Sequence, residues 1–214
     1  MRTWSKVALA MAGVAIGGAG WAAAVPGQGT WETTLLGRDI DGHTVDATDP
    51  QAVFVYDTVL DATWYLGGGN LAFIWPDAMR WAAGLAVGSF SGWMLPASDG
   101  TCSGYACVDS QLGELWYHAL GNPASFQQEP NTGPFHNLGS TYWSSTEYAP
   151  DTRYAWAFGS GIQDGFYKYS LPLSVLAIRP GDVARAIAVP EPSTWVEMLA
   201  GLGLAGLMAR VRRT

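Results

Sequence analysis

Charge is scarce in this 214-residue chain, and positive charge is the scarcest. Only 14% of the residues are charged, and residues 25–188 hold six basic side chains against sixteen acidic ones, a net charge of −10. Nucleic-acid binding depends on clustered lysine and arginine side chains that neutralise phosphates. The deficit therefore excludes nucleic acid as a partner, and polyanionic sugars would meet the same repulsion.

Motifs for common catalytic and nucleotide-binding chemistry are missing. Residues 88–92 place Phe90 where a nucleophile elbow needs serine, and the sequence has no Gly-Lys-Ser/Thr phosphate loop. The histidines, His43, His118 and His136, are scattered, so a zinc site is not expected. We therefore predict no catalytic residue and no cofactor, and expect a protein that is not an enzyme.

Alternating aspartates in residues 38–46 are the one candidate for a metal site. Their spacing does not fit an EF-hand, because Gly42 comes too early. Counting from Asp39, Pro50 also stands where the bidentate glutamate should be. We expect a solvated turn, with a weak extracellular calcium site at Asp39 and Asp41 as the alternative.

The N-terminus has the three parts of a secretory signal. Arg2 and Lys6 precede an uncharged run over residues 7–20, and three alanines follow. About 14 apolar residues are too few for a membrane-spanning helix, which needs about 20. We predict a signal peptide over residues 1–24, cleaved after Ala24.

The C-terminus is a separate segment, residues 189–214. Pro190, Glu191 and Pro192 break regular structure, and an apolar stretch over residues 195–209 leads to a run of arginines. Positive residues beside an apolar segment stay in the cytoplasm, so the two prolines would lie outside. At about 1.5 Å per residue the stretch covers only about 22 Å of a hydrocarbon core of roughly 30 Å. A helix packed on the domain is thus the alternative to a membrane segment.

This tail resembles the PEP-CTERM sorting signal in all three of its parts. The resemblance implies an exosortase-type processing enzyme as partner, transient anchoring in the inner membrane, and a product released or attached outside the cell. Export also places Cys102 and Cys107 in an oxidising compartment. With four residues between them and no nearby histidine, we expect a local disulfide that staples a loop.

The coarse pattern of the remaining chain is mixed. Pro76 and Gly88 bound one helical pattern, and Ser110 and Gly121 bound a second with a clear apolar stripe. Aromatic or β-branched runs predict strands at residues 52–57, 62–66, 141–148, 154–158, 165–170 and 175–178. Residues 25–188 are expected to form one domain.

Several blocks in this domain occur in the order seen in the Lcl C-terminal domain family. They are Tyr56-Asp57 with Leu60 and Trp64, Trp81-Ala82, residues 92–96 and 142–148, Ala155-Trp156, and residues 177–180. The resemblance implies an α+β, C-type-lectin-like fold, with two short helices beside a twisted, mostly antiparallel sheet with long loops. A signal helix at the N-terminus and an apolar helix at the C-terminus would flank it. Formylglycine-generating enzymes share the fold, but their chemistry needs two reactive cysteines at a groove, whereas Cys102 and Cys107 lie in one loop.

Aromatic side chains near loops are the candidates for ligand contact, because rigid scaffolds commonly carry binding function there. We predict stacking by Trp143, Tyr148, Tyr167 and Tyr169, with Glu147, Asp151 and Asp164 as acceptors. The function expected is a non-catalytic binding module of the cell surface or extracellular matrix that recognises a glycan, an exopolysaccharide or another envelope polymer. The alternative is a structural matrix or biofilm component that acts by self-association.

Overall fold

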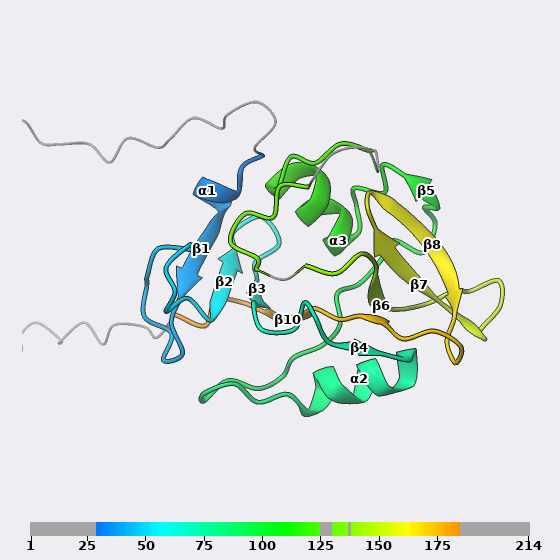
Figure 1. Ribbon diagram of the computed structural model, residues 1–214, viewed down its shortest axis with the longest axis horizontal. Helices are drawn as coiled ribbons and strands as arrows, with labels where there is room; N and C mark the ends of the chain where they lie inside the picture. Colours follow the sequence, from blue (N-terminus) through cyan, green and yellow to red (C-terminus); the bar gives the residue numbers. More distant parts are fainter. Residues whose placement is uncertain (1–28, 125–129, 137, 185–214) are drawn as a thin grey trace, which may run out of the picture.

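The computed structural model describes residues 29–124, 130–136 and 138–184, which form an α+β fold, as predicted (Figure 1). The helices are α1 (Trp31–Thr34), α2 (Trp75–Gly84) and α3 (Gln111–Glu114), and α3 continues into a π-helical turn, η1 (Leu115–Ala119). The strands are β1 (Leu35–Arg38), β2 (Phe54–Asp57), β3 (Ala62–Tyr65), β4 (Ala72–Phe73), β5 (Gly104–Tyr105), β6 (Tyr142–Glu147), β7 (Tyr154–Gly159), β8 (Ile162–Tyr167), β9 (Leu173–Ser174) and β10 (Ala177–Pro180).

The strands divide between two sheets rather than the single sheet that was expected. Sheet A has the order β1-β2-β3-β10, with every neighbouring pair antiparallel. Sheet B has the order β4-β9-β6-β7-β8-β5, in which β6 and β9 are the parallel pair. The division arises because residues 173–180 supply β9 to one sheet and then β10 to the other.

A tight hairpin of β7 and β8 dominates sheet B. Its two turn residues, Ser160 and Gly161, have φ angles of 50° and 85°, and Gly159 pairs with Ile162 across the turn. Positive φ at both central residues is typical of a type I′ turn, whose twist matches that of paired strands. The prediction of a strand at residues 165–170 is therefore wrong in its bounds, because β8 begins directly after this turn at Ile162.

The two predicted helices are present, and the first of them is shorter than expected. The hydroxyl of Ser110 accepts a hydrogen bond from the backbone of Gly113 at 3.0 Å, and Gly121 has φ 65° beyond the helix end, so both predicted boundaries of the second helix are confirmed. The first helix ends at Gly84 instead of continuing toward Gly88, because Leu85 already has an extended backbone.

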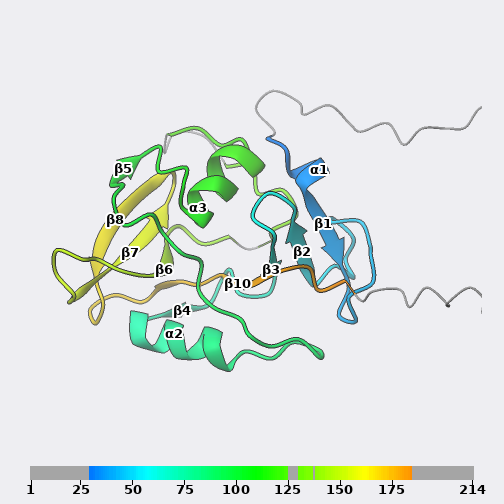
Figure 2. The same cartoon turned by 180° about the vertical axis from the view of Figure 1, so that it is seen from behind.

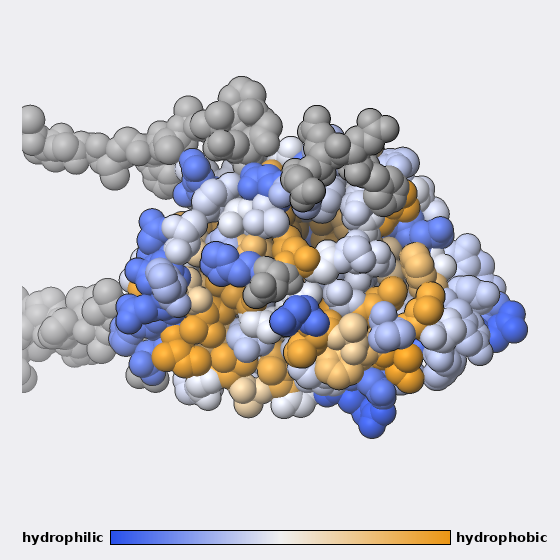
Figure 3. Space-filling model, in the orientation of Figure 1, coloured by the Kyte–Doolittle hydropathy of each residue, from blue (hydrophilic) through white to orange (hydrophobic). Residues whose placement is uncertain are grey.

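Three apolar clusters form the core, each around a fully buried tryptophan or phenylalanine. Trp64 lies between sheet A and the helix α3–η1, Trp143 lies between sheet B and α2, and Phe54 packs on Trp93 behind sheet A. The helices α2 and α3 lie on opposite sides of the strands, as the view from behind also shows (Figure 2). Apolar side chains also reach the surface in patches near β2 and near β4 (Figure 3).

Both predicted terminal segments lie outside the described residues. These are the signal peptide over residues 1–24, with cleavage after Ala24, and the apolar segment over residues 195–209. Among the residues that the structure does describe, no helix is long and apolar enough to cross a membrane.

Candidate functional site

Four tyrosines form one continuous series at the end of sheet B that points away from sheet A, where the β6–β7 connection projects (Figures 1 and 2). Adjacent ring centroids lie 6.4 Å apart for Tyr148 and Tyr154, 5.6 Å for Tyr154 and Tyr167, and 5.8 Å for Tyr167 and Tyr169. All three contacts are edge-to-face, the geometry that aromatic pairs prefer. We call Tyr148, Tyr154, Tyr167 and Tyr169 the tyrosine surface.

Strand register explains why these rings meet. Tyr154 stands directly opposite Tyr167 in the β7–β8 pair, so these two side chains project from the same face. Tyr169 lies in the turn after β8, where its ring packs on that of Tyr167. Tyr148 packs over Gly165, where an added Cβ would lie 3.2 Å from its ring. The glycine thus leaves room for the fourth ring.

One end of the tyrosine surface is exposed to solvent, and the other end packs on the protein core. Tyr167 and Tyr169 are 41% and 59% exposed, whereas the ring of Tyr148 packs on the buried Trp156 at 4.8 Å. Rings with one buried neighbour and one open face are held in place and remain accessible to a flat ligand.

An ion pair borders the tyrosine surface. Arg153 Nε lies 2.9 Å from Asp151 Oδ1, and its Nη2 lies 2.5 Å from Asp151 Oδ2, a two-pronged contact. Hydrogen bonding to Arg153 lowers the pKa of Asp151 to about 2, so the carboxylate stays charged at any physiological pH. The pair sits in the connection between β6 and β7 and offers both donors and acceptors beside the rings.

The structure separates the other predicted ligand residues from this surface. Glu147 and Asp164 stand opposite Ala155 and Ala157 on β7, and thus project from the other face of sheet B. Glu147 pairs there with Lys168, and Asp164 accepts a hydrogen bond from the backbone of Gly165.

The prediction that Trp143 faces a ligand is wrong. Its side chain has no exposed surface, and its indole N–H donates to the carbonyl of Phe73 at 2.8 Å. Trp143 pairs with Ala157, so it points into the core between sheet B and α2. Proximity to a loop in the sequence did not indicate exposure.

Lys168 is a residue of this region that the sequence did not single out. It is 3% exposed, and its Nζ lies 4.2 Å from the centre of the Trp75 ring while pairing with Glu147. The alternation in Tyr167-Lys168-Tyr169 carries the signal, because a lysine between two outward tyrosines must point inward. It fastens the end of β8 to the start of α2, where the backbone of Trp75 also donates to the Lys168 carbonyl at 3.1 Å.

Two of the blocks that resemble the Lcl C-terminal domain family, residues 92–96 and 142–148, contact each other behind the site. The backbone of Ser145 donates to the carbonyl of Pro96 at 2.8 Å, and the hydroxyl of Ser144 accepts from Thr146 at 2.9 Å. Both serines therefore serve the bulged strand β6 and its contact with residues 92–96.

The disulfide loop covers the neighbouring part of β8. Cys102 and Cys107 are joined, as predicted, with their Cα atoms 5.6 Å apart. The buried side chain of Gln163 donates to the carbonyls of Asp99 and Cys102, both at 2.7 Å. Both thiols are therefore consumed in a structural bond that holds the loop on the sheet.

In the aspartate-rich turn, the Asp39 carboxylate accepts hydrogen bonds from the turn itself. Asp39 accepts hydrogen bonds from the backbones of Asp41 and His43 and lies 3.0 Å from the His43 ring. In the part of the chain that the structure describes, no group of three or more histidine, cysteine, aspartate or glutamate side chains is placed to hold a metal.

The C-terminal residues connect the chain with a known class of protein. Residues 188–213 match the PEP-CTERM protein-sorting motif, within one residue at each end of the predicted tail. The motif marks a protein that is exported and sorted by an exosortase, with a sorting step at the membrane. Pro190, Glu191 and Pro192 lie within it. No curated protein sequence matches the chain.

Proposed function

We propose that the exported domain is a non-catalytic binding module of the cell surface or extracellular matrix, and that its tyrosine surface binds a glycan or another envelope polymer. The observation that carries the proposal is the open series of Tyr154, Tyr167 and Tyr169 beside a charged pair. Stacked aromatic rings offer large apolar faces at little cost in conformational entropy. Sugar rings present matching apolar faces of C–H groups.

The polar groups around the rings favour a neutral ligand. Arg153 is already paired with Asp151, and Lys168 is buried, so neither is free to neutralise an acidic sugar. The net charge of −10 over residues 25–188 opposes polyanions further. The Arg153–Asp151 pair can donate to and accept from hydroxyl groups, as a neutral polysaccharide requires.

A C-type-lectin-like fold is part of the proposal. Its support is the meeting of the two resemblance blocks, residues 92–96 and 142–148, and the placement of α2 and α3 beside twisted sheets with long connections. Binding sites in loops on a rigid scaffold are consistent with such a fold.

We further propose that the domain has no catalytic activity. The disulfide leaves Cys102 and Cys107 without a thiol, and Ser144 and Ser145 are engaged in the strand. His43, at an exposed turn, is paired with Asp39.

For the tail, we propose cleavage after transient anchoring in the inner membrane, followed by release or surface attachment. Replacing Pro190, Glu191 and Pro192 by alanines should leave uncut precursor in the membrane fraction. Normal processing of that variant would refute the role of the motif. The same blot, with antibody against the domain, reports where the product goes.

Self-association in a matrix is the second candidate function. Leu71 and Leu171 are 39% and 54% exposed in the segments that flank the β4–β9 pair, at an edge of sheet B. Exposed apolar side chains at a sheet edge favour contacts between copies.

A glycan array run beside sedimentation analysis separates the two functions. The full chain in mild detergent should bind one class of neutral glycan saturably and sediment as one species. Absence of saturable binding together with concentration-dependent assembly would instead favour the structural role.

A further inference from the structure

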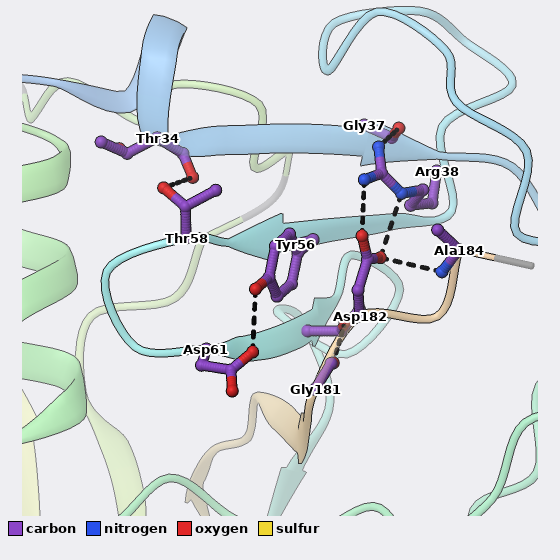
Figure 4. Close-up of polar contacts among 10 residues, drawn as sticks. Thr34, Gly37, Arg38, Tyr56, Thr58, Asp61, Gly181, Asp182 and Ala184 are labelled. Atoms are coloured by element: carbon purple, nitrogen blue, oxygen red, sulfur yellow. Dashed lines mark hydrogen bonds and ion pairs between the residues drawn. The ribbon is translucent and has the colours of Figure 1, made fainter. Parts of the chain in front are cut away.

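The end of the domain is fixed to sheet A beyond its last strand. After β10, the hydroxyl of Thr63 donates to the carbonyl of Gly181 at 2.7 Å (Figure 4). The backbone N–H of Gly181 donates to the carbonyl of Asp61 at 2.8 Å. Val183 is 2% exposed within the apolar cluster around Phe54. The chain is therefore held in place as far as residue 183.

An ion pair clamps this end. Arg38 on β1 reaches across the face of the sheet to Asp182, with Nε 3.0 Å from Oδ1 and Nη2 2.7 Å from Oδ2 (Figure 4). Arg38 is 5% exposed, and its Nη1 also donates to the carbonyl of Gly37 at 2.9 Å. The side chain of Asp182 is 27% exposed, whereas that of Arg38 is 6% exposed, so breaking the pair is costly because it would leave the buried Arg38 charge without its counter-ion. The backbone of Ala184 donates to the same Asp182 carboxylate at 2.8 Å.

A loop from the start of the chain secures the clamped end from another side. A Cβ added at Gly42 would lie 2.3 Å from the carbonyl oxygen of Val183, so the 39–43 turn is in close contact with the outgoing chain. Gly42 has φ 86°, a conformation that favours glycine. The exit point of the tail is thus defined by β1, this turn and Asp182.

Only five residues, 185–189, separate Ala184 from Pro190. At about 3.5 Å per residue the chain from Ala184 to Pro190 spans at most about 21 Å. A domain of this size has a radius of gyration of about 15 Å, so the tether is shorter than the domain is wide. The domain therefore cannot turn freely while the sorting motif is held at a membrane enzyme.

We infer that the Arg38–Asp182 clamp sets the length of the tether, and that the end of the domain around Arg38, Gly42 and Asp182 faces the processing enzyme during sorting. The inference rests on the sorting function of the tail. The exposed aspartates of this end, Asp41 and Asp46, disfavour an anionic lipid surface as the contact. We therefore infer that this end of the domain contacts the extracytoplasmic face of the enzyme that takes the motif.

Tether length is tested by processing of the full chain in a host that contains the enzyme. Deleting residues 185–187, which lie outside the motif, should reduce the processed fraction by at least about tenfold, since a linker too short to span two sites abolishes joint engagement. Replacing the same residues by three glycine and serine residues should preserve processing. Normal processing of the deletion variant would overturn the inference.

The clamp is tested in the deletion background. Arg38→Met or Asp182→Asn should restore part of the lost processing by removing the contacts of Asp182 that hold residues 182 and 184, and should have no effect in a chain of normal length. Arg153→Met is the matched control, because it breaks an exposed pair far from the tail. Failure of both clamp variants to rescue, or equal rescue by Arg153→Met, would contradict the clamp.

Two controls keep the outcomes distinct. Protease resistance of the domain and an intact Cys102–Cys107 bond show that each variant is folded. The triple alanine variant of Pro190, Glu191 and Pro192 reports on the motif itself. Normal processing of the triple alanine variant would refute the sorting function of the tail. If the triple alanine variant is not cleaved but the deletion variant is cleaved normally, only the inference about tether length is refuted.

Discussion

Glu114 and Asp57 bring two carboxyl groups together inside the core, where the residues are 6% and 0% exposed and Glu114 Oε2 has no hydrogen-bond partner among the described residues. Asp57 also accepts from the indole of Trp64 at 3.2 Å and from the backbones of Val59 and Leu60 at 3.0 and 3.1 Å. Asp57 thus accepts three hydrogen bonds, whereas Glu114 Oε2 accepts none from the described residues. Burial, and then the nearby charge of Asp57, raise the pKa of Glu114 from 4.5 to about 7.

Because of this pair, we expect the domain to lose stability as the pH rises from about 4.5 to about 7. The folded state holds the Glu114 proton more tightly than the unfolded chain does, so its contribution is complete below the unfolded pKa and is lost as pH rises through the folded pKa. Urea unfolding at pH 4.5 and 7.5 measures the change. Glu114→Gln should reduce the difference between the two free energies of unfolding.

The matched control for that measurement is Glu32→Gln, because Glu32 is exposed in α1. The Glu32→Gln variant should show the same pH dependence of the free energy of unfolding as the wild-type chain. An equal effect of the two substitutions, or no effect of Glu114→Gln, would show that the buried pair does not govern stability in this range.

Lys168 should contribute more to stability through its stem than through its ion pair. Lys168→Ala should lower the free energy of unfolding by about 2 kcal/mol, because it removes the buried stem and the contact with the Trp75 ring. Glu147→Gln should cost less, since the amide oxygen of glutamine can still accept from Lys168 and the Glu147 side chain is 52% exposed. Chemical denaturation compares the two, and equal losses would contradict this division.

The Cys102–Cys107 bond should be structural. Replacing both cysteines by serine removes the cross-link that restricts the unfolded chain. The free energy of unfolding should fall by about 2 kcal/mol for a loop of this length. Thiol titration of the unreduced, denatured protein should find no free thiol. Two reactive thiols would instead revive an oxidative enzyme as a candidate.

Gly161 should be required by the β7–β8 turn. Gly161→Ala would impose φ 85° on alanine and place a Cβ 2.9 Å from the hydroxyl of Tyr117. We expect a loss of about 1–3 kcal/mol in the free energy of unfolding. Gly92→Ala, also at positive φ but with open space around it, separates backbone strain from the contact.

Local signals in the sequence predicted local structure well. Ser110 and Gly121 marked their helix because a capping hydroxyl and a left-handed glycine act within a few residues. Strand β1 was missed, since Leu35-Leu36-Gly37-Arg38 shows no alternation and forms a strand only through pairing with β2.

The candidate site depended on register, which the sequence does not display. Tyr148, Tyr167 and Tyr169 were predicted individually, but their neighbour Tyr154 was missed because it joins them only through its pairing with Tyr167. The same register sends Glu147 and Asp164 to the opposite face.

The central claim is that the tyrosine surface binds a neutral glycan, and titration of the glycan found on the array tests it most directly. In the full chain, Tyr167→Ala with Tyr169→Ala should weaken binding by about tenfold to a hundredfold through the loss of two stacking rings. Tyr105→Ala is the matched control, because Tyr105 is 47% exposed on β5, outside the series. Unchanged affinity in the double variant, or equal loss in the control, would contradict the claim.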